Sequence, residues 1–344
     1  MNYRHAFHAG NFADVVKHAL LVWLLDALAR KPRPFLVLDT HAGAGFTDLD
    51  AEPATRTGEW RAGIGRLLPL PLREGVGSGS APGSVPPRLP PLPLREGVGG
   101  RGTNPPNVAV PSPPPPPASD LARTVSCSGG SPPSPQPPPA RGGGEDPGLD
   151  RYLALVRRLG LYPGSPALIR ALLRPGDRLA CCELHPEDHA SLRARFAGDP
   201  QVGVHRRDGY EAVKALLPPP ERRGLILLDP PFESSDEFAT LAQALRTGLA
   251  RFPAGVFAAW YPIKHRAPIR DFFARLDGLR DLVAAEIWLR APLDPGRLNG
   301  SGLLVANPPY GFEAEVPALL GALCAHLAEP GFGEGAAVTR IADE

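Results

Sequence analysis

The chain has 344 residues, of which 43% are hydrophobic, and its formal net charge is +1. This length allows one large domain or two smaller ones with a sizeable core. The small net charge excludes a global basic field for nucleic acid, so any such contact depends on local patches. The four cysteines fit neither a zinc site nor a disulfide framework, and we expect no metal. Without a signal peptide or a membrane-length apolar run, a cytoplasmic protein without membrane contacts is expected.

The first predicted helix follows an aromatic, basic and histidine-rich segment, residues 2–11. Asn11 is a candidate N-cap, with Asp14 in the first turn. Apolar residues then recur at helical spacing until a proline ends the pattern. Lys17 and His18 lie off the main apolar stripe, so the periodicity alone places His18 at the surface or at the boundary of the core.

A buried strand is predicted over residues 35–38, and it runs into Asp39 and a Gly-x-Gly turn at 43–45. Such a turn lets a ligand approach the backbone closely. The third glycine of the dinucleotide fingerprint is absent, so the turn by itself is weak evidence for a cofactor. Residues 57–68 are then predicted to be helical.

The composition changes abruptly between residues 69 and 147, where Pro, Gly and Ser dominate. Such a segment cannot bury enough apolar surface to offset its ordering entropy, which predicts a disordered insert. It contains a near-exact repeat, because residues 66–77 return as 88–99, but two copies are too few for a solenoid. The functional alternative is a Pro-rich ligand for an aromatic groove on another protein.

Alternating helices and strands are predicted after the insert. A helix over 149–159 is followed by a turn at 162–166, which contains Ser165 and leads into another helix. Further strands are predicted at 178–182, 202–205, 225–228, 255–260, 284–289 and 302–306. This alternation indicates a parallel or mostly parallel sheet with right-handed crossovers.

Four acidic residues follow successive predicted strands: Asp39, Glu183, Asp208 and Asp229. Open α/β sheets bind ligands at the carboxyl ends of their strands. Glu183 falls where an acid can bind both hydroxyls of a ribose, and Asp208 can accept from an adenine amine while Gly209 admits the ring. With neither a P-loop nor the full dinucleotide fingerprint, the predicted cofactor is an adenosine compound without phosphates, a description that S-adenosylmethionine fits.

The stretch after the strand at 225–228 combines an acceptor, a proline pair and an aromatic ring. Asp229 supplies a carboxylate, Pro230 cannot continue the strand pairing and leaves its carbonyl free to accept, and Phe232 offers a flat apolar face. These groups suit a planar ring with an exocyclic amine. The structural alternative is a Pro-Pro turn capped by the acid. A tetrapeptide of similar composition at 307–310 is a decoy, because its strand is expected near an antiparallel edge of the sheet.

In combination, these motifs resemble the bacterial 23S ribosomal RNA adenine-N6 methyltransferase family called RlmJ. The matching stretches are residues 3–11, 14–15, 17–18, 39–45, 162–166, 183–186, 208–209, 229–231 and 260–262, which cover the chain outside the insert. The resemblance implies an α/β fold of the class I, S-adenosylmethionine-dependent methyltransferase type. Such a fold is Rossmann-like, with a mostly parallel sheet of seven to eight strands and a small helical insertion subdomain.

The same resemblance divides the chain into three parts. The methyltransferase core would comprise residues 1–57 and 161–344, and the helical subdomain 58–68 and 148–160. The insert at 69–147 splits this subdomain, which is a departure from the family pattern. A second departure is Phe232 in place of the commoner tyrosine, which keeps a stacking ring but removes a hydroxyl.

The resemblance also implies residue roles and a reaction, the methylation of an adenine N6 in 23S ribosomal RNA. Asp229 would be catalytic. The implied cofactor-binding residues are His18, His41, Ser165, Glu183, Asp208, Gly209 and Asp229. The expected RNA-binding residues are Tyr3, Arg4, Lys17, Pro230 and Phe232, where Tyr3 follows from the resemblance, Arg4 and Lys17 are candidate phosphate contacts, Pro230 offers its carbonyl and Phe232 stacks.

Three other functions remain open from the sequence. A DNA adenine methyltransferase would use the same tetrapeptide. A non-catalytic RNA-binding protein would not need Asp229 together with Glu183 and Asp208. A protein or small-molecule methyltransferase would share the cofactor residues but not the reason for Asp-Pro-Pro-Phe.

Overall fold

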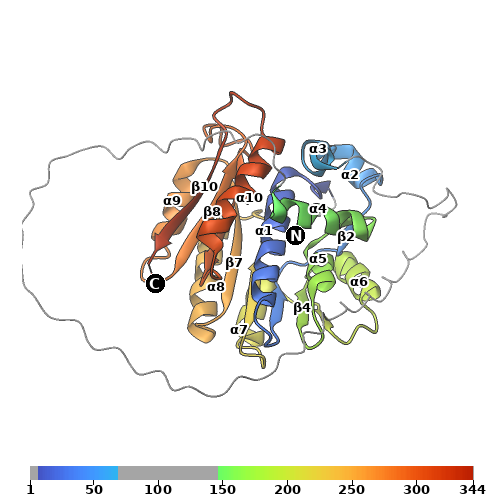
Figure 1. The fold of residues 1–344 in the computed structure, drawn as a ribbon. Helices are drawn as coiled ribbons and strands as arrows, with labels where there is room; N and C mark the ends of the chain where they lie inside the picture. Colours follow the sequence, from blue (N-terminus) through green and yellow to red (C-terminus); the bar gives the residue numbers. More distant parts are fainter. Residues whose placement is uncertain (1–6, 69–145, 344) are drawn as a thin grey trace, which may run out of the picture. The chain divides into compact units, whose positions relative to one another are not determined.

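In the computed structural model, one sheet of eight strands runs in the order β10-β8-β9-β7-β6-β1-β4-β5 (Figure 1). The structure describes residues 7–68 and 146–343, which belong to one folded unit. The strands are β1 (Leu36–Asp39), β4 (Arg178–Cys182), β5 (Val202–His205), β6 (Gly224–Leu228), β7 (Val256–Ile263), β8 (Leu282–Trp288), β9 (Gly300–Ala306) and β10 (Gly335–Ala342). Strands β5, β4, β1, β6 and β7 pair in parallel, whereas β9 and β10 are antiparallel to their neighbours. The predicted α/β class I methyltransferase fold with a mostly parallel sheet is confirmed.

Helices cover both faces of this sheet, so the central strands are buried along their whole length. Helices α7 (Gly209–Leu216), α8 (Glu237–Arg251) and α9 (Arg266–Ala274) pack on one face. Helices α1 (Phe12–Ala29), α5 (Ser165–Leu172) and α10 (Phe312–Leu327) lie on the other (Figure 1). Helix α6 (Pro186–Arg195) lies beside β5. Burial on both faces explains the continuous apolar runs of β1 and β6. Within the described ranges, no helix is both long and apolar enough to cross a membrane.

Helix α1 is buried on almost every side, because it packs against α4 (Pro147–Leu159), α5, α10 and β9. The Asn11 side chain caps it by accepting from the Asp14 N–H at 3.0 Å, as predicted. Lys17 and His18 are buried, with exposures of 5% and 1%. The placement of His18 at a surface from periodicity is therefore wrong, since neighbouring helices cover the side of α1 that faces away from the sheet.

The helix predicted over residues 57–68 is broken, and a separate helix precedes it. Residues 52–67 form α2 (Glu52–Thr57), the 3₁₀ helix η2 (Glu59–Ala62) and α3 (Ile64–Leu67). Gly58 separates the first two in the left-handed region, with φ of 63°. At Gly63 a Cβ atom would lie 2.1 Å from the Gly10 carbonyl oxygen, so this approach leaves no room for a side chain.

The helix that follows the insert begins close to its predicted position. This helix, α4, begins at Pro147 and is capped by Asp146, while most of the insert predicted at 69–147 lies outside the described residues. The division into a core and a helical subdomain stays a prediction. Strand β10 is not among the predicted strands, since its Gly335 and neighbouring alanines have little β-propensity.

Candidate active site

A cavity of about 700 Å³ opens at the carboxyl ends of the parallel strands. The strand order reverses here, because β4 lies on one side of β1 and β6 on the other, and open α/β sheets bind ligands at such switch points. The cavity is lined by the turn at 41–48 after β1, by Glu183 after β4, by residues 229–232 after β6, by Trp260 of β7 and by the beginning of α1.

The four acidic residues lie along one edge of the sheet, as the sequence predicts. Asp39 ends β1, and Glu183, Asp208 and Asp229 follow β4, β5 and β6, whose order in the sheet is β6-β1-β4-β5. Their environments differ. Glu183 and Asp229 line the cavity, whereas Asp39 is fully buried and Asp208 caps a helix.

Glu183 fixes the Gly-x-Gly turn. Its carboxylate accepts hydrogen bonds from the N–H groups of Gly43, at 2.8 Å, and His185, at 2.7 Å. Burial raises the pKa of Glu183, and these amides partly oppose the increase. Gly43 and Gly45 have φ values of 61° and 84°, which explains why the turn uses glycines. Since a carboxylate has about four acceptor sites, Glu183 keeps acceptor capacity for a ligand's hydroxyls.

Asp208 and Gly209 have local roles at the start of α7. The Asp208 carboxylate accepts from the N–H groups of Tyr210 and Glu211, at 2.9 and 3.0 Å. A Cβ atom on Gly209 would lie 2.2 Å from the Thr40 carbonyl oxygen, so glycine permits α7 to approach the end of β1. Neither residue is among those lining the cavity, and their cofactor contacts stay predictions.

Asp229 belongs to a buried cluster of charges. Lys17 Nζ donates to Asp229 Oδ2 at 2.5 Å and to Asp14 Oδ1 at 2.8 Å, and the side chains of Lys17, Asp14 and Asp229 are 5%, 5% and 12% exposed. Burial by itself would lower the pKa of Lys17, but the two carboxylates raise it above its ordinary value, which keeps the ammonium charged. Among the described residues, no donor is bonded to Asp229 Oδ1. This oxygen can therefore accept from a ligand.

Aromatic rings form the wall next to Asp229. Phe232, with φ of 51°, contacts Phe238 and Trp260 edge to face, with ring centroids 4.8 and 5.5 Å apart. The Trp260 indole donates to Ser301 Oγ at 2.9 Å, which fixes its ring, and Lys17 Nζ lies 5.8 Å from the ring centre. Phe232, Trp260 and Pro230 all line the cavity, so a planar ligand would meet apolar surfaces beside an acceptor.

The predicted histidines and Ser165 also line the cavity. His18 Nδ1 lies 3.2 Å from the Tyr162 hydroxyl, and His41 Nδ1 lies 2.8 Å from Thr40 Oγ1. Burial lowers the pKa of His41 to about 4, so its imidazole is neutral at pH 7 although the residue lines the cavity. Ser165 is buried at the first turn of α5.

Asp39 is a buried carboxyl group behind this site, with 0% exposure. Burial raises the pKa of Asp39 to about 7, and the nearby Ser165 hydroxyl and His41 amide oppose this increase only in part. Neither carboxyl oxygen has a well-aligned hydrogen-bond partner among the described residues. Burial therefore brings the titration of this carboxyl group into the neutral pH range.

The tetrapeptide at 307–310 lies at the amino ends of the parallel strands, whereas the cavity lies at their carboxyl ends. It follows β9, which is antiparallel to β7, so its first residue, Asn307, comes after the residue that pairs with Phe257 near the beginning of β7. The Asn307 amide donates to the carbonyls of Pro253 and Gly255, both at 2.7 Å, and Tyr310 is 96% exposed. These residues do not line the cavity, in agreement with the choice of Asp229.

Two expected RNA contacts, Tyr3 and Arg4, lie outside the described residues.

Sequence reasoning missed the roles of Asp14 and Trp260. The separation of three residues between Asp14 and Lys17 places them on one face of α1, and this signal could have revealed their pairing. Within the part of the chain that the structure describes, no group of three or more His, Cys, Asp or Glu residues is arranged to hold a metal ion.

Comparison with known proteins gives similarities over nearly the whole chain. A family model described as "Ribosomal RNA large subunit methyltransferase D, RlmJ" matches residues 32–70 and 147–339. Two curated relatives, from Escherichia coli and Haemophilus influenzae, carry the name "Ribosomal RNA large subunit methyltransferase J". Each is 32% identical to this chain over 97% of its length and 96% of the relative's. A crystal structure of a Legionella pneumophila protein aligns with a TM-score of 0.68 and 26% identity, over 97% of this chain and 98% of that one.

Proposed function

This chain belongs to the RlmJ family of ribosomal RNA large subunit methyltransferases, and we propose that its methyl acceptor is the N6 amine of an adenine in 23S ribosomal RNA. The enzyme is an rRNA methyltransferase and uses S-adenosylmethionine, as its family does. The family also argues against a non-catalytic RNA-binding protein. The arrangement around Asp229 supports the adenine acceptor more than any other observation does.

The cavity residues fit S-adenosylmethionine. The Gly-x-Gly turn at 43–45 exposes backbone beside the carboxylate of Glu183, which would hold the ribose hydroxyls. His18, His41 and Ser165 would complete this side of the site. When bound, S-adenosylmethionine supplies a methyl group made electrophilic by its sulfonium.

Asp229 would orient the target amine. The lone pair of an adenine N6 is delocalised into the ring, which makes the amine a poor nucleophile. Hydrogen bonds from N6–H to Asp229 Oδ1 and to the Pro230 carbonyl would favour a pyramidal nitrogen and hold it in position. Lys17, bonded to Oδ2, limits the rotation of this carboxylate.

The aromatic wall would hold the base. Phe232 would stack on the adenine, and Trp260 supports the Phe232 ring from its edge. A base must leave its own stack to reach such a pocket, which is easiest for an unpaired nucleotide. Tyr3 and Arg4 stay predicted RNA contacts of the segment that precedes α1.

The test is to map methylation by mass spectrometry. Purified enzyme and S-adenosylmethionine are incubated with 23S ribosomal RNA, 16S ribosomal RNA and double-stranded DNA, and each nucleic acid is then digested to nucleosides. We expect N6-methyladenosine in 23S RNA alone, at a position that is unmethylated in cells lacking the gene. Methylation of another atom, or of DNA in preference to RNA, would refute the proposal.

A further inference from the structure

Positive and negative side chains occupy different walls of the cavity. The acidic side chains belong to α1, η2, α6 and the segments that follow β1, β4 and β6: Asp14, Asp48, Glu59, Glu183, Asp188 and Asp229. Lys17 lies among them and is neutralised by Asp14 and Asp229. The remaining lining cations are Lys264, directly after β7, and Arg290 and Arg297, in the connection between β8 and β9. One wall is therefore acidic and the other basic.

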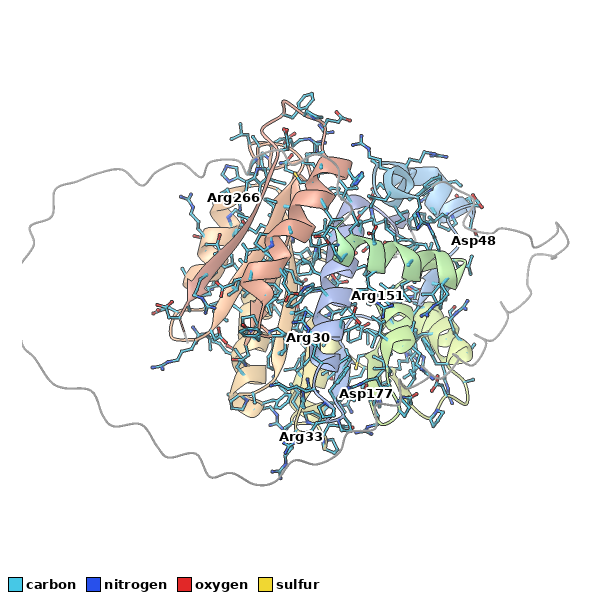
Figure 2. All side chains as sticks on the ribbon, in the orientation of Figure 1. Arg30, Arg33, Asp48, Arg151, Asp177 and Arg266 are labelled. Atoms are coloured by element: carbon cyan, nitrogen blue, oxygen red, sulfur yellow. The ribbon has the colours of Figure 1, made fainter. Side chains whose placement is uncertain are left out.

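The basic wall is available to a ligand. Lys264 and Arg297 are exposed, Arg290 is half-buried, and none of the three forms an ion pair among the described residues. Arg266, only two residues beyond Lys264, is bound instead to Glu286 at 2.5 Å. Figure 2 shows Arg266 and the acidic-wall residue Asp48 on opposite sides of helix α1 in that view. Burial, and then the charge of Arg297, lowers the pKa of Arg290 and outweighs the opposing charge of Glu329, so the two guanidinium groups are close enough to repel each other. An anion beside them would relieve this repulsion.

A buried asparagine fixes the backbone of this wall. The Asn299 side-chain amide donates to the carbonyls of Lys264, at 2.7 Å, and Asp294, at 2.8 Å. Its main-chain N–H donates to the Ile263 carbonyl at 2.9 Å, and Asn299 is 0% exposed. The end of β7 and the β8–β9 connection are thus joined before any ligand binds, which reduces the entropy lost on binding.

The basic wall continues from the proposed base pocket. Trp260, Pro262 and Lys264 all line the cavity, and residues two apart in a strand share one face. Four residues of extended chain span about 13 Å, so Lys264 lies outward of the aromatic wall along the same strip. A polyanion approaching Asp229 would be repelled by the acidic wall and attracted to this one.

We propose that Lys264, Arg290 and Arg297 bind the phosphodiester backbone of RNA beside the target nucleotide. The proposal rests on the proposed function in that the nucleotide delivered to Asp229 is the adenine to be methylated. The acidic wall, by contrast, would contact the uncharged ribose and the cationic sulfonium of the cofactor. The two walls thus separate the anionic substrate from the cationic cofactor within one cavity.

The test removes two charges without removing bulk, in the variant Lys264→Gln/Arg297→Gln. The matched control is Lys31→Gln/Arg33→Gln, which changes two exposed cations that precede β1. They lie at the amino end of this strand, whereas the cavity lies at its carboxyl end (Figure 2 labels Arg33). RNA affinity is measured at a series of salt concentrations with a 23S fragment that contains the methylated position. The slope of log K against log salt should fall by about 2 in the first variant and stay unchanged in the control. Melting temperature and S-adenosylmethionine affinity should match the wild type in both.

The outcomes separate this inference from the proposed function. An unchanged salt slope in Lys264→Gln/Arg297→Gln, or an equal loss in the control, would overturn the phosphate contacts even if the wild type methylates adenine N6. A variant that keeps its RNA slope but loses binding to polyglutamate would point to an acidic protein and overturn it as well. Wild-type methylation at another atom would refute the proposed function, while the slopes would still decide the phosphate contacts.

Discussion

The variant Lys17→Met tests whether the buried charge cluster is held together by its single cation. Methionine keeps an unbranched chain of similar length but removes the ammonium, leaving the carboxylates of Asp14 and Asp229 without their shared partner. Removing one member of a buried ion pair typically lowers the free energy of unfolding by about 3–5 kcal/mol. Here two carboxylates, only 5% and 12% exposed, lose the same donor. We therefore expect the upper end of that range at pH 8, and a melting temperature lower by about 10 °C or more.

The pH dependence of this loss provides a second measurement. Without Lys17, Asp14 and Asp229 would be two buried carboxylates with no cation between them, and burial favours the uncharged form of such groups. A buried carboxyl group without a partner therefore costs the protein less stability at low pH, where it can bind a proton, than at high pH. The deficit of Lys17→Met should therefore be smaller at pH 5 than at pH 8.

The assay is urea unfolding of wild type and variant at both pH values. Lys214→Met, on the exposed side of α7, is the control and should change stability by less than about 0.5 kcal/mol. Adding Asp14→Asn to Lys17→Met should recover part of the loss, because one unneutralised carboxylate is removed. A deficit below about 1 kcal/mol that is equal at both pH values would refute the reasoning.

Three further predictions follow from individual positions. Asp229→Ala should lower turnover by at least about a hundredfold, whereas Asp229→Asn keeps an acceptor oxygen and should retain substantial activity in the same methylation assay; equal losses would show that the negative charge is needed. Burial raises the pKa of Asp39 to about 7 from an ordinary 3.8, so wild-type stability should fall by roughly 3 kcal/mol between pH 4 and pH 7 on its account; Asp39→Asn should remove this part of the thermal-shift pH profile, and an unaltered profile would contradict the assignment. Gly209→Ala should lower the free energy of unfolding by about 1–3 kcal/mol, because the new methyl group meets the Thr40 carbonyl; Gly321→Ala, in open space on α10, should stabilise slightly, and similar effects of the two changes on urea unfolding would argue against a clash.

The sequence predicted correctly those features that are encoded locally, namely the individual parallel strands and the residues at their carboxyl ends. Apolar runs located β1, β4, β5 and β6, and the acid after each run lies where parallel strands place it. Strand direction also separated Asp229 from the tetrapeptide at 307–310. These predictions succeeded because local pattern and tertiary structure agree there.

The remaining errors concern contacts between distant segments. The burial of His18 depends on helices that cover α1 from outside the sheet, and helical periodicity carries no information about a second covering layer. The break at Gly63 depends on the approach of Gly10. The pairing of Lys17 with Asp229 joins residues 212 positions apart, so it required the fold to be known.

Helix α10 anchors both ends of the chain that flank residues 69–145. Before that stretch, the Arg66 guanidinium donates to the Leu327 carbonyl at 2.7 Å, and after it Gly148 packs beside Leu319. The fold thus sets the separation of these two ends, and each doubling of the chain between them adds only about 0.6 kcal/mol of closure entropy. Neither anchor lines the cavity. We therefore expect that a change of chain length at this point, for example by duplication of a short repeat or insertion of a reporter domain, would leave the cavity residues in place.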